Sequence, residues 1–71
     1  MQRNKVNSSI FISIGYDPYK KLLQLEFQNG SIRNYSDVPE TVYEEFMLAP
    51  SLGKFYLGEI KGKYVWIITN D

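Results

Sequence analysis

The sequence predicts an α+β domain made of a three-stranded antiparallel meander, one or two helices packed on one face, and a C-terminal strand that joins the sheet. Two observations support this fold class. Apolar residues alternate with period two near both ends of the chain, and a stretch with helical periodicity separates these regions. With 71 residues, the chain has room for one small domain.

The first predicted strand covers residues 9–17. One set of side chains, expected to face the core, alternates with a second set that points the other way. The expected core set is Ile10, Ile12, Ile14 and Tyr16, and the opposite set is Phe11, Ser13 and Gly15. Asp17-Pro18 then supplies residues that favour a turn.

Two further strands follow and complete the meander. Leu23, Leu25 and Phe27 alternate with polar residues, which indicates one buried and one solvated face. Asn29-Gly30 predicts a type I′ turn, because this dipeptide tolerates two positive φ angles. Residues 31–36 should therefore pair back as a third strand, with Arg33 and Tyr35 sharing one face.

Helical patterns occupy the middle of the chain. The segment DVPETVYEEFMLAP, residues 37–50, predicts a helix with a capping box formed by Asp37 and Glu40, and Pro50 ends it. Ser51–Leu57 predicts a short second helix capped by Ser51. The glycine-containing segment that follows, 58–62, is expected to be a loop or a bent connection.

The last predicted strand covers residues 64–69. Tyr64, Trp66 and Ile68 alternate with Val65 and Ile67, so both faces are apolar. We therefore expect this strand to be central in the sheet or buried at a subunit interface.

Composition narrows the function. Eight basic residues balance eight acidic ones, whereas proteins that bind long double-stranded DNA usually carry a basic surplus. No segment approaches the roughly 20 apolar residues of a membrane span. The basic N-terminus lacks the continuous apolar run of a signal peptide, so the sequence predicts a cytoplasmic protein with no membrane partner.

A homo-oligomer is expected from the size of the chain. A domain of this length buries only about 60% of its extended surface, and without Cys or His neither a disulfide nor most metal sites can reinforce it. Plentiful aromatic residues offer apolar area to a core or an interface.

Catalysis is not predicted. The chain lacks His, the commonest general base, and Cys, the strongest nucleophile. Asp37, Glu40 and Glu44 recur at helical spacing and have the ligands that Mg²⁺ prefers, but acidic residues at a helix start are more simply a solvated face that suits the helix dipole. We therefore predict no metal site and no cofactor.

The turn SLGK is one candidate anion site. Unpaired N–H groups at a helix start, a glycine and a lysine together suit a phosphate, although the full P-loop pattern is absent. The structural alternative is that Ser51 only caps the helix and Gly53 permits a close approach to the sheet.

Tyrosines that neighbour cations form a second candidate, because bases stack on aromatic rings. The alternative is that these tyrosines are core residues with a solvated hydroxyl. Taken together, the predicted ligand-binding residues are Arg33, Tyr35, Ser51, Gly53, Lys54, Tyr56, Lys61, Lys63 and Tyr64.

The order of several short motifs resembles the KTSC domain, a family named for its place at the C-terminus of some lysyl-tRNA synthetases. These motifs are IGYD at 14–17, QNG at 28–30, YSDVPETVYEEF at 35–46 and APSLGKF at 49–55, followed by Ile60 and Tyr64. The resemblance covers residues 9–66. It predicts a flexible segment at 1–8 and a single domain at 9–69.

The resemblance implies little about activity, because the family has no agreed function and RNA binding is only a suggestion for it. Two departures stand out here. The family's Tyr-x-Tyr is Arg33-Asn34-Tyr35 in this chain, and the sequence after Tyr64 is VWIITND where relatives often turn basic.

The leading hypothesis is a non-enzymatic module that captures a small nucleotide-like ligand or a short RNA. One concrete version, by analogy of size and charge, is sequestration of a nucleotide second messenger, as small phage-encoded sponge proteins do. The alternative is a protein-interaction adaptor with no nucleotide ligand. A third option is a domain whose function lies in a synthetase or another host chain.

Overall fold

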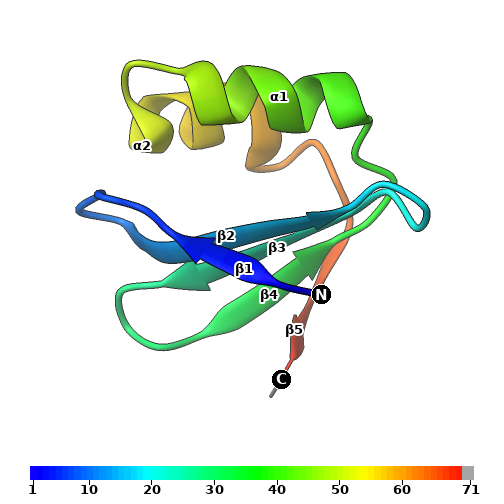
Figure 1. The fold of residues 1–71 in the computed structure, drawn as a ribbon, viewed down its shortest axis with the longest axis horizontal. Coiled ribbons are helices and arrows are strands. Elements are labelled where there is room, and N and C mark those ends of the chain that lie inside the picture. The colour runs from blue at the N-terminus through cyan, green and yellow to red at the C-terminus, as the bar shows by residue number, and fades with distance from the viewer. Residues whose placement is uncertain (70–71) are drawn as a thin grey trace.

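The computed structural model describes residues 1–69 as a five-stranded antiparallel sheet with a helical layer on one face (Figure 1). The strands are β1 (Arg3–Lys5), β2 (Phe11–Asp17), β3 (Leu22–Phe27), β4 (Ile32–Tyr35) and β5 (Trp66–Thr69), and they are adjacent in chain order. Helices α1 (Glu40–Leu48) and α2 (Leu52–Phe55), with the π-helical turn η1 (Tyr56–Ile60), lie between β4 and β5 in the chain. The predicted α+β class is confirmed, and the three predicted meander strands form the centre of a larger sheet.

Strand β1 lies within residues 1–8, which were predicted to be a flexible segment outside the domain. Arg3 pairs with Gly15 and Lys5 with Ser13, so β1 forms one edge of the sheet. Arg3 also donates hydrogen bonds to Ser13 and Gln24 across three strands. These contacts cover Gln24, which is only 2% exposed although alternation placed it on a solvated face.

A β-bulge corrects the predicted faces of β2. Phe11 pairs with Phe27, but the next pair is Ser13 with Glu26, so Ile12 has no direct partner. The extra residue shifts the side-chain alternation, because successive side chains point to opposite faces. Phe11, which was expected to point away from the core, is therefore fully buried within it, together with Ile14.

The hairpin between β3 and β4 also differs from its prediction. Gly30 has a φ of +90°, but Asn29 is not among the residues with positive φ, so the turn is not type I′. The N–H of Gly30 donates to Phe27 O, and that of Phe27 to Ser31 O. This is a three-residue connection with glycine at its left-handed position.

The first helix starts without the predicted capping box. Its N-cap is Pro39, with no side-chain hydrogen bond, and Asp37 lies before it with a φ of +59°. The expected face of Asp37, Glu40 and Glu44 therefore does not form on one helix, and within residues 1–69 no cluster of three or more acidic residues suits a metal ion. The predicted packing face is present, since Phe46 is buried and Val42 and Met47 pack beside the core.

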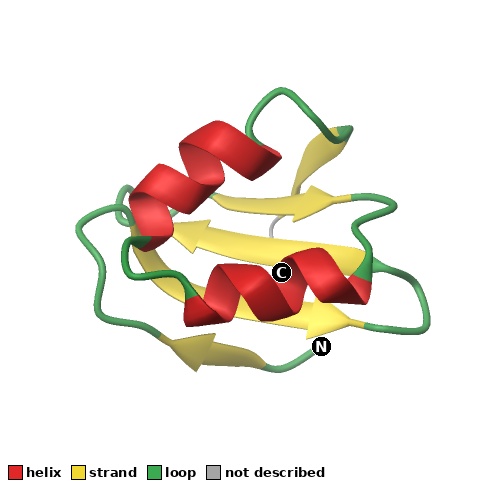
Figure 2. Ribbon diagram, turned by 90° about the horizontal axis from the view of Figure 1, so that it is seen from above, coloured by secondary structure: helices red, strands yellow, loops and turns green. Residues whose placement is uncertain are grey.

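The second helix continues further than expected. Ser51 caps α2 as predicted, and the chain then forms η1, although a loop or a bent connection was predicted from residue 58. The N–H of Lys61 donates to Tyr56 O at 2.8 Å, which closes the π-helical turn and leaves Tyr56 and Ile60 buried. Figure 2 shows α1 and the α2–η1 segment lying side by side over the sheet.

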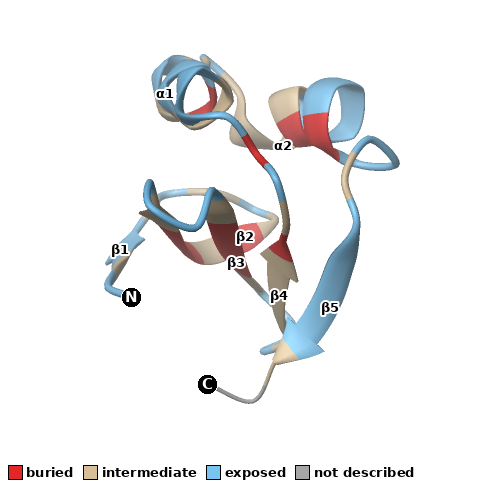
Figure 3. Cartoon of the chain, turned by 90° about the vertical axis from the view of Figure 1, so that its right-hand side faces the viewer, coloured by how far each residue is buried: buried red, intermediate tan, exposed pale blue. Residues whose placement is uncertain are grey.

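The C-terminal strand is at the edge of the sheet, which corrects the prediction of a central strand. It pairs with β4 alone, Trp66 opposite Tyr35 and Ile68 opposite Arg33. Figure 3 shows β5 as exposed along nearly its whole length. Among residues 1–69, no helix is long and apolar enough to cross a membrane.

At Gly15, strands β1 and β2 lie too close together to leave room for a side chain. A Cβ built there would lie 2.8 Å from the carbonyl oxygen of Gln2 and 3.3 Å from Arg3 Cα, both backbone atoms that cannot rotate away. We predict that Gly15→Ala lowers the free energy of unfolding by about 1–3 kcal/mol, as overpacked sites do. Urea denaturation measures the change. Gly58→Ala is the control, because no atom lies within 4 Å of its added Cβ, and an unchanged Gly15→Ala variant would contradict the prediction.

Candidate ligand-binding site

The predicted site residues separate into two places in the structure. Arg33, Tyr35 and Tyr56 meet between β4 and η1, whereas Ser51, Gly53 and Lys54 line a cleft beside the N-terminal segment. Lys61 and Lys63 are exposed on the connection from η1 to β5, next to the half-buried Tyr64.

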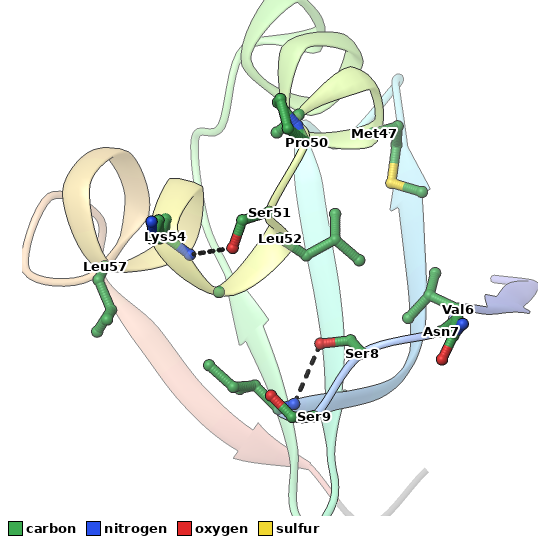
Figure 4. Close-up of a pocket in the computed structure, with 13 residues that line it drawn as sticks. Val6, Asn7, Ser8, Ser9, Met47, Pro50, Ser51, Leu52, Lys54 and Leu57 are labelled. Carbon is green, nitrogen blue, oxygen red and sulfur yellow. Dashed lines mark hydrogen bonds between the residues drawn. The ribbon is translucent and has the colours of Figure 1, made fainter.

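The polar groups of the turn at Ser51 form contacts within the domain. Ser51 Oγ accepts a hydrogen bond from the N–H of Lys54 at 3.2 Å, which satisfies a donor that an anion would otherwise contact (Figure 4). A Cβ on Gly53 would lie 2.6 Å from Ile10 Cδ1, so glycine permits this close approach to the sheet. The geometry favours the structural interpretation of both residues.

The cleft beside this turn has a volume of about 650 Å³ and mixed polarity. Ser8, Ser9 and Asn7 line one side, Met47 and Leu57 contribute apolar surface, and Lys54 is the one charged residue along its wall (Figure 4). A single exposed lysine provides little recognition by itself.

The cluster around Arg33 is more specific. The hydroxyl oxygens of Tyr35 and Tyr56 lie 2.7 Å apart, which joins β4 to η1 by a buried hydrogen bond. Arg33 Nη1 donates to Tyr35 Oη at 3.3 Å and lies 3.5 Å from Tyr56 Oη. The shared face of Arg33 and Tyr35 was predicted from alternation and is confirmed.

Two aromatic rings enclose the guanidinium of Arg33. Its Cζ atom lies 3.9 Å from the ring centroid of Trp66 and 4.8 Å from that of Phe27. Both distances lie within the range of cation–π interaction. Trp66 is 39% exposed, so one part of its ring contacts Arg33 while another is open to solvent.

Arg33 has no negative partner in the described chain. Within residues 1–69, no carboxylate lies within 4.0 Å of it; the ion pair that does form joins Arg3 to Glu26. Its Nε atom is buried without a hydrogen-bond partner. Both hydrogen bonds of Arg33 to the tyrosines use Nη1, and Nη2 forms none within this part of the chain.

The neighbouring phenol does not neutralise this charge. Burial and the hydrogen bond with Tyr56 raise the pKa of Tyr35 to about 12, against the opposing effect of Arg33. Tyr35 is therefore a neutral phenol at physiological pH. A partly buried cation that lacks a counter-ion is costly, and an anion would relieve this cost.

Sequence reasoning missed Trp66 and Phe27 as site residues. Trp66 follows Arg33 by more than 30 positions, and only the pairing of β5 with β4 brings the two together. The rings of Tyr35 and Tyr56, in contrast, are enclosed in the core and present only their hydroxyl groups to the site. Among the aromatic residues that surround Arg33, Trp66 is the exposed one.

The fold and this cluster define a small α+β domain with a polar, cation-containing site at one end of its core. The KTSC domain model matches residues 7–64, and the chain therefore belongs to the KTSC domain family. The crystal structure of a KTSC domain protein from Yersinia pestis superimposes with a TM-score of 0.91 and is 42% identical, covering 96% of each chain.

Relatives occur both as small proteins and as parts of a large enzyme. A protein from Stutzerimonas stutzeri is 38% identical over 56 residues, which is 79% of each chain. A lysine–tRNA ligase from Nostoc is 42% identical over 60 residues, which is 84% of this chain but 11% of the ligase. The resemblance noted from the sequence motifs is confirmed.

The buried hydroxyl pair should contribute measurably to stability. Tyr35→Phe removes one partner and leaves the Tyr56 hydroxyl and Arg33 Nη1 with fewer bonds, so we predict a loss of about 1–3 kcal/mol in the free energy of unfolding. Urea denaturation measures it. Tyr19→Phe is the matched control, because Tyr19 is 96% exposed and should tolerate the change.

Stability should also fall at alkaline pH. Because the pKa of Tyr35 is about 12 in the folded chain and near 10.0 when unfolded, the folded state holds this proton more tightly. Its contribution is complete below about pH 10 and is lost as the pH rises towards 12. Thermal unfolding between pH 8 and pH 12 tests this. The loss of stability over the upper ~2 pH units should be smaller in Tyr35→Phe than in the original chain. An identical pH profile in that variant would contradict the assignment.

Proposed function

We propose that this domain is a non-enzymatic binding module that captures a small nucleotide-like ligand or a short RNA. The observation that carries the proposal is the partly buried guanidinium of Arg33, which has no anionic partner within residues 1–69. A phosphate oxygen at Nη2 would supply the missing negative charge through a charge-assisted hydrogen bond.

The aromatic component of the proposal comes from Trp66. Its ring is already oriented by stacking against Arg33 and by pairing opposite Tyr35, yet 39% of the residue remains exposed. An ordered ring of this kind can stack with a base at a low entropic cost, and base stacking contributes roughly 1–3 kcal/mol. A ligand that combines a phosphate and a base fits both features.

Lys61 and Lys63 support an anionic ligand in the same region. Both are exposed on the short connection that leads from η1 into β5, immediately before Trp66. They add positive charge to the segment that precedes Trp66 without giving the whole chain a basic surplus. This balance favours a compact ligand over a long duplex, because long nucleic acids need many cationic contacts.

Capture without turnover is the simplest activity for this site. The chain has no His or Cys to act as base or nucleophile, and Tyr35, whose pKa is raised, holds its proton at physiological pH. In this proposal the domain sequesters its ligand or presents it to a larger assembly. The occurrence of related domains in lysine–tRNA ligases is consistent with either use.

The test is isothermal titration with cyclic nucleotides, linear nucleotides and a short RNA at low salt. We predict that one of these classes binds and that Arg33→Met weakens binding at least tenfold, because the phosphate loses its cation. The same variant should be as stable as the original chain or more so, since an apolar residue replaces an unpaired buried charge. Lys20→Met is the control, because Lys20 is exposed in the turn between β2 and β3.

Two results would reject the proposal. One is the absence of heat with every ligand class, and the other is unchanged affinity in a folded Arg33→Met variant. The stability measurement separates a lost site from a lost fold.

The adaptor function remains the second candidate because of β5. Ile67 and Ile68 in this strand are each 63% exposed, and Val65 just before it is 76% exposed, which is an unusual amount of aliphatic surface on neighbouring positions. Exposed apolar patches of this kind mark interaction surfaces. A chain that binds no nucleotide but retains a partner through β5 would favour this function.

A further inference from the structure

We propose that β5 pairs with β5 of a second copy of this chain, so that two sheets join into one across a two-fold axis. This inference goes beyond ligand binding and does not depend on it. It rests on the chemistry of the two sheet edges and on the direction in which the free backbone groups of β5 point.

The two edges of the sheet are protected differently. At one edge, β1 carries Arg3 and Lys5, and charged side chains on an edge strand discourage pairing with other chains. At the other edge, residues 64–69 read YVWIIT and contain no charge, proline or glycine. A strand with this composition is a template for β-pairing unless something covers it.

A second copy of the chain matches this edge in charge. An uncharged strand that meets its own copy brings no like charges together, and the zero net charge of the chain adds no long-range repulsion. Antiparallel pairing of a strand with itself is also two-fold symmetric, which closes the assembly at two chains. The pairing would cover apolar side chains that a small domain otherwise leaves in water.

The register follows from the hydrogen bonds to β4. The N–H of Ser36 donates to Val65 O at 2.8 Å, so Val65 directs its backbone towards β4. Because these directions alternate along an antiparallel strand, Trp66 and Ile68 direct their N–H and C=O groups outwards. The pairing that satisfies them places Trp66 opposite Ile68 of the second copy, with Ile67 opposite its own equivalent on the axis.

The first test compares the molecular mass in solution of the unmodified chain with that of a proline variant. Sedimentation or light scattering should give a mass of two chains, and Ile68→Pro should reduce it to one chain. Proline at 68 removes an outward N–H but no bond to β4, and proline is tolerated where an edge strand faces outwards. The control is Leu48→Lys on α1, because proline at that position would disrupt the helix. Leu48 is 84% exposed, and this change should leave the mass unchanged.

The second test is disulfide cross-linking through a single introduced cysteine, which is possible because the chain has none of its own. Ile67→Cys places one thiol per chain at the axis, where directly opposed residues have Cα atoms about 4.5 Å apart, within reach of a disulfide. Mild oxidation should cross-link this variant rapidly, whereas the exposed Leu48→Cys should cross-link slowly. This test does not depend on whether Ile68→Pro folds.

Three outcomes would overturn the proposal. They are a single-chain mass for the unmodified protein at its highest soluble concentration, a two-chain mass that persists in folded Ile68→Pro, and equal cross-linking rates for the two cysteine variants. A single-chain mass together with capture of another protein by β5 would assign this edge to a different partner. None of these results bears on nucleotide binding, which the isothermal titration measures separately.

Discussion

The hydrogen bond between the hydroxyl groups of Tyr35 and Tyr56 is the contact on which the rest of this structure depends. It joins the sheet to the helical layer inside the core, where neither group can bond to water. The ring of Tyr56 also contacts those of Phe11, Phe27 and Tyr35, so one residue of η1 meets three strands. The π-helical turn orients Tyr56 and Ile60 towards this core together.

Arg33 gains its significance from this arrangement. A core of phenols and phenyl rings would be complete without a cation, yet the chain places a guanidinium beside the two hydroxyls and between two aromatic rings. Such a group lowers stability unless it is used, because its charge is partly desolvated without a counter-ion. Natural proteins retain costs of this kind mainly at functional sites.

The site and the free edge of the sheet are neighbours through β5. Trp66 contacts Arg33 on the face that the helices cover, and the same strand carries the exposed Ile67 and Ile68. A short strand therefore connects two features that are otherwise separate, a cation enclosed by aromatic rings and an uncharged edge. This is why the residues that follow the matched family region, 65–69, matter for both proposals.

The sequence by itself determined the α+β class, the core-facing side of β3, the shared face of Arg33 and Tyr35, the apolar stripe of α1 and the cap at Ser51. Each of these depends on local periodicity or on a residue's own backbone preference. Only the tertiary structure decided the rest. The bulge that buries Phe11, the addition of β1, the edge position of β5 and the stacking of Trp66 on Arg33 all arise from pairings between distant segments. No local pattern encodes these, because a strand's register and neighbours are chosen by the packing of the whole sheet.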